Sequence, residues 1–461
     1  MTITSTAFKE TELGRLPEDW SIKTTEDILL RERGSLKIGP FGSQLKREYF
    51  TSKGYKVYGQ ENVFKSDFSI GQRYINKERF EFLKSCELKE NDLLISMMGT
   101  IGQAAIAPKG IEDGIIDSHL IRLRVDESVF DRRFLLYLFR SRLIQDQLDA
   151  LAVGTIMSGL SSGIIRQLKF PCPPCREQHA IARLLGSFDD KIELNRQMNR
   201  TLEQIAQALF KFWFVDFDPV RAKGEGRWKE GESLPGMPAD MWELWSSEFE
   251  KSGPEQIPRG WKLSSLSQVC SLVTDGAHFS PREEPKGPKR IATVKDMGSV
   301  DFNIENCKSI TNADYQKLVD WGCRPEKGDI LLSKDGTMGL VHLYSGHQDV
   351  VLLSSIAILR PLEGLSEFLW LYLLDGTNRQ KIVTEFSSGS VLRRLVVKDI
   401  KRIPVIVPPK NILVQFATIV QPIHRRLISS RQESRVLTSL RDTLLPKLLS
   451  GEIRVFVGSD A

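Results

Sequence analysis

The sequence has no long apolar run and little surplus charge, and both absences exclude classes of protein. No apolar run approaches the ~18–20 residues that a membrane-spanning helix needs. The opening stretch, MTITSTAFKETELGRLPEDW, has neither the basic start nor the apolar core of a signal peptide. We therefore expect a cytoplasmic protein without a membrane partner. Lys and Arg total 64 against 59 Asp and Glu, a net charge of +5, which is too small to indicate nucleic-acid binding by itself.

Cysteines and catalytic motifs are also scarce. Six Cys in 461 residues do not indicate a disulfide framework. Cys172 and Cys175 form a CxxC, but two prolines fill the gap and no second CxxC or close His pair exists. We interpret them as small apolar residues at the end of a buried strand, and we predict no metal site.

The common catalytic signatures are missing as well. The sequence has no GxxxxGK[ST] phosphate loop, no HExxH motif and no Asn-Pro-Pro-aromatic run of the kind that adenine methyltransferases use. We therefore predict that the chain has no catalytic residues, is not an enzyme by itself and binds no cofactor directly.

What the sequence does contain is a long internal repeat. Four blocks recur in the same order, at offsets of 235 to 241 residues: LPEDW (16–20) with IPRGW (257–261), IGPFGS (38–43) with DGAHFS (275–280), NDLLISMMGTIG (91–102) with GDILLSKDGTMG (328–339), and 154–174 with 389–409. The repeat is far longer than the unit of a solenoid. The chain is therefore a tandem duplication of a unit about half its length.

Each repeat predicts a globular lobe followed by a long helix. DLLIS and DILLS are typical of buried strands, whereas 134–151 and 367–386 have helical spacing. Residues 176–214 lack proline and carry apolar residues in steps of three and four: Ile181, Leu185, Phe188, Ile192, Leu202, Ile205, Leu209 and Trp213. Asn195 and Asn199 fill the gap in this stripe, where polar residues could fix the helix register.

The second long helix, about 411–450, is less regular than the first. Its apolar stripe is Phe416, Ile419, Ile423, Leu427, Leu437, Leu440 and Leu444. Pro422 should kink this helix, and Pro446 should end or bend it. A long helix with one apolar stripe must bury that stripe, so we predict that the two helices pair antiparallel as a coiled coil.

The predicted fold class is α+β (mixed α/β), with two similar globular domains joined by two long antiparallel helices in an internal pseudo-two-fold repeat. The predicted segments are a first lobe at 1–174, a central helix at 175–215, a linker at 216–256, a second lobe at 257–409 and a C-terminal helix at 410–461. Gly, Pro and charged residues mark the linker. Trp228, Trp242 and Trp245 suggest that it is nevertheless attached to a surface.

Several segments carry a likeness to one known family. They are FDDKIELNRQMNRTLEQIAQALFKFWF followed by DFDPVRAKGEGR, the Pro-x-x-Trp restart at 258–261, the closing LRDTLLPKLLSGEI, and the loops GPFGSQLK (39–46) and DGAHFSPRE (275–283). With these segments the chain resembles the specificity subunit of type I restriction–modification enzymes, over essentially its whole length.

The resemblance implies a non-catalytic DNA reader with two target-recognition domains, each of which binds one half of a bipartite site in double-stranded DNA. The helices would space the two halves and dock two methyltransferase subunits, which bind S-adenosylmethionine and methylate adenine. A separate motor–nuclease subunit would use ATP and Mg²⁺.

Candidate DNA contacts lie in the loops between strands. Readers of DNA use Asn, Gln, Ser, Thr, Lys and Arg to reach base edges and phosphates. The candidates in the first lobe are Ser43, Gln44, Lys46, Arg47, Gln60, Asn62 and Thr100, and those in the second are His278, Ser280, Arg282, Lys289, Arg290, Lys295, Lys334 and Thr337. Each could instead be a solvated loop residue.

Two further features bear on partners and on targets. The apolar residues Phe210, Phe212, Trp213 and Phe214 are interpreted as a surface for partner subunits. The loops of the two lobes differ, GPFGSQLKREY against DGAHFSPREEP. We therefore expect the lobes to recognise different sequences.

Three alternatives stay open at this point. The chain could be the recognition subunit of a related type II-like restriction or phage-defence methylation system, which differs in its partners. A coiled-coil scaffold would explain the helices but not two large divergent lobes, and a DNA-binding assay with its salt dependence would distinguish it. A free-standing enzyme acting on DNA would need a motif that the sequence lacks.

Overall fold

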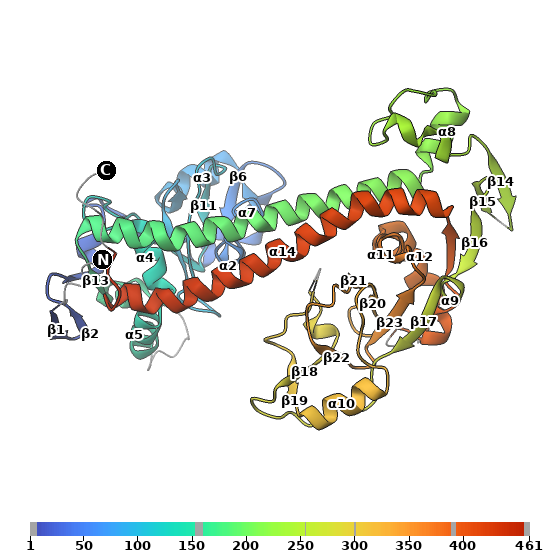
Figure 1. Ribbon diagram of the computed structural model, residues 1–461. Coiled ribbons are helices and arrows are strands. Elements are labelled where there is room, and N and C mark those ends of the chain that lie inside the picture. Colours follow the sequence, from blue (N-terminus) through green and yellow to red (C-terminus); the bar gives the residue numbers. More distant parts are fainter. Residues whose placement is uncertain (1–6, 153–159, 254, 299–300, 389–392, 456–461) are drawn as a thin grey trace. The chain divides into compact units, whose positions relative to one another are not determined.

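The computed structural model describes residues 7–152, 160–253, 255–298, 301–388 and 393–455. The chain divides into two compact units, Met1–Glu193 with Ser434–Ala461, and Leu194–Glu433. Two helices of 40 residues, α7 (Cys175–Phe214) and α14 (Lys410–Leu449), belong partly to each unit (Figure 1). Among the described residues, no helix is both long and apolar enough to cross a bilayer.

The lobe of the first unit is built on two larger sheets, one with the strand order β10-β9-β12-β4 and one with the order β5-β7-β6-β11-β8, and on the two-stranded sheets β1-β2 and β13-β3. Its strands are β1 (Phe8–Thr11), β2 (Gly14–Pro17), β3 (Ser21–Thr24), β4 (Leu36–Ile38), β5 (Phe50–Thr51), β6 (Tyr55–Tyr58), β7 (Tyr74–Ile75), β8 (Glu87–Leu88), β9 (Leu93–Ser96), β10 (Ala104–Ile106), β11 (Gly114–Ile116), β12 (Leu120–Leu123) and β13 (Lys169–Cys172). Its helices are α1 (Thr25–Ile28), α2 (Gln60–Lys65), α3 (Lys77–Phe82), α4 (Arg132–Phe139), α5 (Arg142–Ala152) and α6 (Ser162–Gln167).

The lobe of the second unit repeats this plan with sheets in the order β17-β23-β20-β21 and β19-β18-β22. Its strands are β14 (Phe249–Ser252), β15 (Glu255–Pro258), β16 (Lys262–Ser265), β17 (Cys270–Asp275), β18 (Lys289–Ala292), β19 (Lys308–Ile310), β20 (Ile330–Ser333), β21 (Val341–Leu343), β22 (Val350–Leu352), β23 (Ile356–Pro361), β24 (Ser387–Ser388), β25 (Arg394–Leu395) and β26 (Pro404–Val407). Its helices are α8 (Asp218–Gly224), α9 (Leu266–Val269), α10 (Asn312–Asp320), α11 (Ser366–Leu374), α12 (Gly376–Phe386) and α13 (Val397–Ile400).

The duplication is visible in the topology and in buried contacts. Strands β4, β9, β10 and β12 occupy the sheet positions that β17, β20, β21 and β23 occupy in the second lobe. The predicted buried strands β9 and β20 are buried along their whole length. The residue just before each of these strands is an Asp that pairs with an Arg at the end of the neighbouring strand. Asp92 pairs with Arg124, directly after β12, at 3.1 Å, and Asp329 pairs with Arg360 of β23 at 2.9 Å. The prediction of two similar mixed domains is confirmed.

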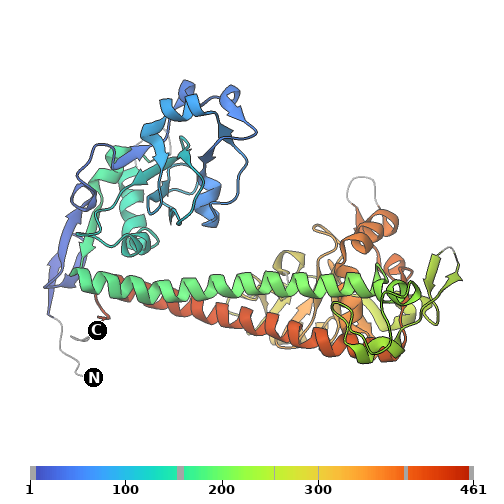
Figure 2. The same ribbon diagram turned by 90° about the horizontal axis from the view of Figure 1, so that it is seen from above.

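The two long helices pair antiparallel within each unit, as predicted. In the first unit, Arg441 Nη1 near the end of α14 donates to Asp189 Oδ1 in the first half of α7 at 2.6 Å. In the second unit, the ring of Phe214 at the end of α7 lies 4.7 Å from that of Phe416 near the start of α14. Figure 2 shows the two helices side by side.

The polar gap in the stripe is part of the buried seam, as predicted. Asn195 is fully buried, and its Nδ2 donates to Ser430 O at 3.2 Å and to Glu433 Oε2 at 3.0 Å. Ser430 Oγ in turn donates to Asn199 Oδ1. Paired amide and hydroxyl groups in an apolar seam favour the one register in which they meet.

Two details of the helices differ from the predictions. Helix α14 continues through Pro446 to Leu449, so Pro446 does not end it, and Pro422, for which a kink is predicted, also lies within the helix. Both prolines are exposed, whereas Val420, Leu427 and Leu448 are buried. Tertiary packing of the apolar face thus outweighs the backbone hydrogen bond that each proline removes.

The apolar stripe also drifts off the predicted residues. Ile205 of α7 and Leu440 of α14 were predicted to be buried, but they are 44% and 46% exposed. On α7, the buried residues near Ile205 are Ala206 and Phe210. A helix of 3.6 residues per turn turns by about 20° per heptad relative to a repeat of 3.5. Over 40 residues this rotation moves the stripe by one position.

The segment 216–256 is folded, which corrects its interpretation as a linker without core residues. It contains α8 and β14, and it contributes Trp228, Met237 and Trp245 to the hydrophobic core of the second unit. Trp228 and Trp245 are each 2% exposed. The expected attachment through tryptophans is therefore a contribution to the core itself.

Candidate nucleic-acid interface

Two connections leave each four-stranded sheet at the same end. In the first lobe, Ile121 of β12 pairs with Ile38 of β4 on one side and with Ile95 of β9 on the other. The loop after β4 (residues 39–47, the β4 loop) and the turn after β9 (residues 97–103, the β9–β10 turn) thus start level with each other. They are two strand spacings apart, or about 10 Å.

The second lobe repeats this arrangement. Ala357 of β23 pairs with Asp275 of β17 and with Leu332 of β20. The loop after β17 (residues 276–284, the β17 loop) and the turn after β20 (residues 334–340, the β20–β21 turn) are therefore neighbours too. Most of the predicted DNA contacts fall on these four segments.

A glycine fixes the start of each loop against a neighbouring strand. A Cβ added to Gly39 would lie 1.8 Å from Asp117 O, and one added to Gly276 would lie 2.2 Å from Leu352 O. Neither contact leaves room for a side chain. These repeated glycines allow the loop backbone to pass close to the strand end.

The predicted contacts on the two loops are exposed. Residues 42–45 of the β4 loop form a 3₁₀ turn, and the residues that reach solvent on this loop include Ser43, Gln44, Lys46 and Arg47. On the β17 loop they include His278, Ser280 and Arg282. Each loop thus presents hydrogen-bonding and basic side chains of the types that read DNA.

The Gly-Thr-x-Gly segments, residues 99–102 and 336–339, are hairpin turns that join the antiparallel strands β9 and β10, and β20 and β21. Gly99 and Gly102 have φ of +68° and +76°. The preceding serine closes each turn, because Ser96 Oγ donates to Thr100 O and Ser333 Oγ to Thr337 O, both at 2.6 Å. The Thr100 and Thr337 side chains are exposed.

Half-buried Gln60, at the start of α2, contacts the same turn. Its Nε2 donates to Met98 O at 2.6 Å. Gln60 therefore lies beside the β9–β10 turn.

Asn62 is a structural residue, which corrects its prediction as a DNA contact. It is 1% exposed, its Oδ1 accepts from Gly59 N at 2.9 Å, and its Nδ2 donates to Asp67 O and Ile70 O, each at 3.0 Å. The side chain holds the ends of α2 and the loop that follows. All its hydrogen-bonding capacity faces the protein interior.

The prediction that Lys334 contacts DNA is also wrong. It is 7% exposed, and its Nζ lies 2.7 Å from Asp275 Oδ2. This ion pair joins the base of the β20–β21 turn to the base of the β17 loop. The internal repeat could have predicted this burial, because the counterpart of Lys334 in the first lobe is Met97, an apolar residue that is 6% exposed.

Lys289 and Arg290 are engaged within the fold, whereas Lys295 is exposed. Lys289 Nζ pairs with Asp349 and lies 4.6 Å from the centre of the Tyr315 ring. Burial acts to raise the pKa of Asp349, but hydrogen bonds from Lys289 and Tyr315 outweigh it and lower that pKa. Arg290 Nη1 donates to Gly287 O at 2.7 Å. Of these three candidates, Lys295 is the one that faces solvent.

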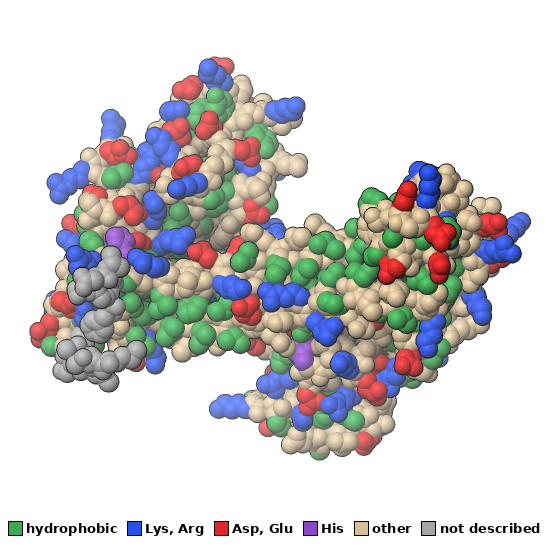
Figure 3. Space-filling model, turned by 45° about the horizontal axis from the view of Figure 1, so that its top comes forward, with side chains coloured by type: hydrophobic (Ala, Val, Ile, Leu, Met, Phe, Trp, Pro, Cys, Tyr) green, Lys and Arg blue, Asp and Glu red, His purple; other side chains and the backbone are tan. Residues whose placement is uncertain are grey.

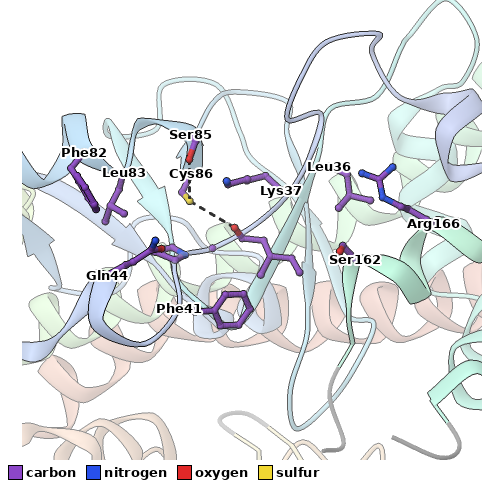
Figure 4. Close-up of a pocket in the computed structure, with 13 residues that line it drawn as sticks. Leu36, Lys37, Phe41, Gln44, Phe82, Leu83, Ser85, Cys86, Ser162 and Arg166 are labelled. Atoms are coloured by element: carbon purple, nitrogen blue, oxygen red, sulfur yellow. Dashed lines mark hydrogen bonds between the residues drawn. The ribbon is translucent and has the colours of Figure 1, made fainter.

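A cavity of about 400 Å³ opens beside the β4 loop (Figure 4). Gln44, Phe82 and Leu83 lie at one end of it, and Leu36, Ser162 and Arg166 at the other. The Phe41 and Phe82 rings are 57% and 65% exposed. The described lining holds cations and aromatic rings and no carboxylate.

One group of potential metal ligands occurs among the described residues, at the start of α4. Ligand atoms of Glu127, Asp131 and His179 lie within 4.8 Å of one another. Asp131 Oδ1 also accepts from Phe134 N as the helix cap, and Glu127 pairs with Arg132 at 3.3 Å. Capping and ion pairing account for both carboxylates. Cys172 is buried at the end of β13 as predicted, but Cys175 is exposed.

Comparison with known proteins supplies the decisive observation. The sequence pattern described as "Type I restriction modification DNA specificity domain" matches the chain twice, at residues 17–204 and 258–438. The two matches fall on the two halves of the internal repeat. The chain belongs to this family.

Curated relatives in the family match over long stretches. The type I restriction enzyme MjaIX specificity subunit of Methanocaldococcus jannaschii is 26% identical over 98% of this chain and 97% of its own length. The HindI specificity subunit of Haemophilus influenzae is 31% identical over 63% of this chain and 70% of its own length. The crystal structure of a type I S subunit from M. genitalium superposes with a TM-score of 0.56 at 17% identity, over 93% of this chain and 96% of that one. This last likeness supports the fold.

The aromatic residues that we interpreted as a surface for partner subunits lie in the core of the chain itself, which corrects that interpretation. Phe210, Trp213 and Phe214 are 1%, 0% and 7% exposed, and half-buried Phe212 packs against the same cluster. The rings surround Phe416 and Phe368, and Trp213 meets Trp245 edge-on at 5.4 Å. An aromatic run at a helix end predicts burial, but it does not say whether the covering surface belongs to the same chain.

Other apolar residues of the long helices do reach solvent (Figure 3). In the second unit, Leu194 and Ile205 of α7 are 57% and 44% exposed. In the first unit, Val436 and Leu440 of α14 are 59% and 46% exposed. Spacings of eleven and four residues place each pair on one face of its helix. These residues, together with Val414 of α14, which is 47% exposed, form the exposed apolar surface of the helices, and the aromatic run does not.

Proposed function

We propose that the chain is the DNA specificity subunit of a type I restriction–modification complex, in which each lobe reads one half of a bipartite target. The observation that carries this proposal is that the two lobes share one frame but expose different side chains at the same place. At the offset of 237, exposed Phe41, Lys46 and Arg47 on the β4 loop stand where exposed His278, Glu283 and Glu284 stand on the β17 loop. A shared frame with different loop chemistry suits two half-sites of different sequence.

Each lobe would place its loop and its hairpin turn against one groove of the DNA. The B-DNA major groove is about 12 Å wide, close to the separation of about 10 Å between the starts of the two segments in a lobe. Exposed Lys46, Arg47 and Arg282 would hold phosphates, while Gln44, Ser43 and His278 would face base edges. Affinity would then fall steeply with salt, because phosphate contacts release counterions.

The helices would set the spacing between half-sites and bind the other subunits. The buried Asn195–Ser430 hydrogen bond favours a single register, as a spacer requires. The exposed residues Leu194 and Ile205, and Val436 and Leu440, would contact the methyltransferase subunits. In this assignment S-adenosylmethionine is held by the methyltransferase subunits, and ATP and Mg²⁺ by a motor–nuclease subunit.

The test is co-purification with the methyltransferase subunit, followed by mapping of methylated adenines across a genome. The proposal predicts a stable complex and methylation at one motif made of two short halves with an unspecified gap. Methylation at a single uninterrupted motif, or by this chain without the partner, would contradict it. Binding of random duplex DNA that does not depend on salt would contradict the DNA-binding role.

A further inference from the structure

The β4 loop is held from outside by one arginine. Arg79 of α3 donates through Nη2 to Ser43 O at 3.3 Å and to Gln44 O. Its guanidinium lies 3.8 Å from the centre of the Tyr49 ring and 4.7 Å from that of Phe82. The two rings restrict the side chain, so the two carbonyls are held at a fixed place relative to α3.

The β17 loop of the other lobe is held in the same way by a lysine. Lys308 of β19 donates through Nζ to Ser280 Oγ at 3.3 Å and to Pro281 O. The repeat aligns Ser43 with Ser280 and Gln44 with Pro281, at an offset of 237. The same backbone carbonyl is therefore bound by a cation in both lobes.

The two cations do not come from equivalent positions. Asn76 caps α3 and Thr311 caps α10, which aligns these two residues at an offset of 235. The counterpart of Lys308 is then Arg73, whose Nη2 contacts Glu61 and Asp117 instead. The counterpart of Arg79 is Asp314. A cation binds the same carbonyl position in both halves, but the two cations come from different positions of the repeat. Common ancestry alone would have left the cation at equivalent positions.

Neither cation has another ionic role in the part of the chain that the structure describes. No carboxylate lies within ion-pair distance of Arg79 or of Lys308 among the described residues. Their hydrogen bonds go to the loops, so the loops account for their placement. Arg79 is half-buried rather than free in solvent.

Holding the β4 loop in place matters because few backbone hydrogen bonds form within this loop. The 3₁₀ turn at 42–45 contributes the backbone bond from Gln44 N to Phe41 O, and such short turns are weak. A free loop loses backbone entropy when it binds DNA and can also rearrange to suit a wrong base. A loop that is already ordered discriminates better, since its side chains cannot follow a mismatched base edge.

We infer that Arg79 and Lys308 are positioning residues that set base discrimination, each for its own half-site, by fixing the backbone of the β4 loop and of the β17 loop. The inference rests on the proposed function, because it assumes that these loops read DNA. In this role neither cation contacts a base or a phosphate. Each acts through the carbonyl of residue 44 or 281.

The experiment uses the complex with its methyltransferase subunits and four variants, R79Q, R79K, K308Q and K77Q. K77Q is the matched control, because Lys77 is an exposed cation on the same helix as Arg79. The target motif is first mapped with the wild-type complex. Methylation rates are then measured on duplexes with the motif and with each single base change, and binding is measured from low to high salt.

The expected result is specific to one half of the motif. R79Q should lower discrimination at one or more positions of one half by about tenfold, the scale of one lost bidentate base contact, while the other half changes by less than about twofold. K308Q should do the same for the other half, and K77Q should leave both unchanged. R79K should fall between R79Q and wild type, because an ammonium can still donate to the carbonyls but stacks less well between rings. The salt dependence of binding should stay the same in R79Q.

Several results would overturn the inference. Unchanged discrimination in R79Q would show that the held carbonyl does not matter for reading. A salt slope lower by about one, with unchanged base preference, would show that Arg79 binds a phosphate directly. Equal loss in both halves would indicate general destabilisation. A wild-type complex without any two-part motif would instead refute the proposed function, and that outcome is seen before any variant is made.

Discussion

Arg454, near the C-terminal end of the described chain, forms an ion pair with Glu177 in the first turn of α7, with Nε 2.6 Å from Glu177 Oε1. Trp20 Nε1 donates to the other carboxylate oxygen at 3.1 Å, and Arg454 Nη2 also reaches Asp19 at 2.7 Å. Burial acts to lower the pKa of Arg454, but the hydrogen bonds to Glu177 and Asp19 outweigh it and raise that pKa. This cluster joins the end of α14 to the start of α7 and to the first lobe.

Removal of Arg454 should therefore destabilise the first unit. Glu177 is 7% exposed, so R454A leaves a buried carboxylate without its cation, and the expected loss in the free energy of unfolding is about 3 kcal/mol. D19N is the control, because the Asp19 side chain is 49% exposed and should cost less than about 1 kcal/mol. Urea denaturation at pH 7 measures both. Equal effects of the two substitutions would show that burial of Glu177 has no consequence.

The surface of α7 can be separated from its core by two substitutions. F210A should cost about 3–5 kcal/mol of stability, because the buried ring packs against Phe214, Phe368 and Phe416. I205E should change stability by less than about 0.5 kcal/mol, since Ile205 is 44% exposed, but should weaken methyltransferase binding. Thermal unfolding and titration with the partner subunit measure the two effects. Normal partner binding by I205E would place the docking surface elsewhere.

Acid should weaken the second unit through His424. Burial is the largest cause that lowers the pKa of His424, to about 4, and its ring packs 5.0 Å from Trp370. The unfolded chain takes up this proton near pH 6.5, so between pH 6.5 and 4 the unfolded state binds more protons. Stability should fall by up to about 3 kcal/mol as the pH is lowered through that window.

The variant H424Q tests this directly. It should be less stable than wild type at pH 7, because it disturbs packing, but should lose less stability between pH 6.5 and pH 4. Part of the dependence should persist, since burial also lowers the pKa of His342. Denaturant unfolding at pH 7, 5.5 and 4.5 gives the comparison. Parallel curves for the two proteins would mean that His424 does not titrate with unfolding.

Added length in the helices should change the gap in the DNA target. Four residues inserted in α7 between Asn199 and Ala206, and four in α14 between Val420 and Leu427, lengthen each helix by about 6 Å. B-DNA rises about 3.4 Å per base pair, so the gap should grow by about one or two base pairs. Mapping of methylated adenines reads the gap. If the gap stays the same in a folded, active variant, the helices do not set the spacing.

The sequence predicted most of the fold because the chain contains its own comparison. Two halves aligned at an offset near 237 show which runs are framework, such as Leu93–Ser96 and Ile330–Ser333, and which are loops. The long helices followed from apolar spacing alone. The residues buried between the two long helices could be predicted only to within one position. Both Ile205 and Ala206 are apolar, and the gradual rotation of the apolar stripe around α7 decides that Ala206 is the buried one.

The site was predicted less well, for a different reason. A polar residue in a loop has the same letter whether it faces solvent, like Gln44, or caps a turn, like Asn62. Burial of Lys334 depends on Asp275, a partner 59 positions away that no local pattern reveals. Arg79 and Lys308 were not among the candidates, because their partners are backbone carbonyls and leave no trace in side-chain identity.

Exchange of one lobe shows whether each lobe reads its own half of the target. Residues 257–409 are replaced by the matching segment of a family member with a different target, and methylated adenines are mapped for the hybrid complex. We expect a motif in which one half is unchanged and the other is that of the donor, with the gap retained. A hybrid that folds and methylates DNA but changes both halves, or neither, would contradict it.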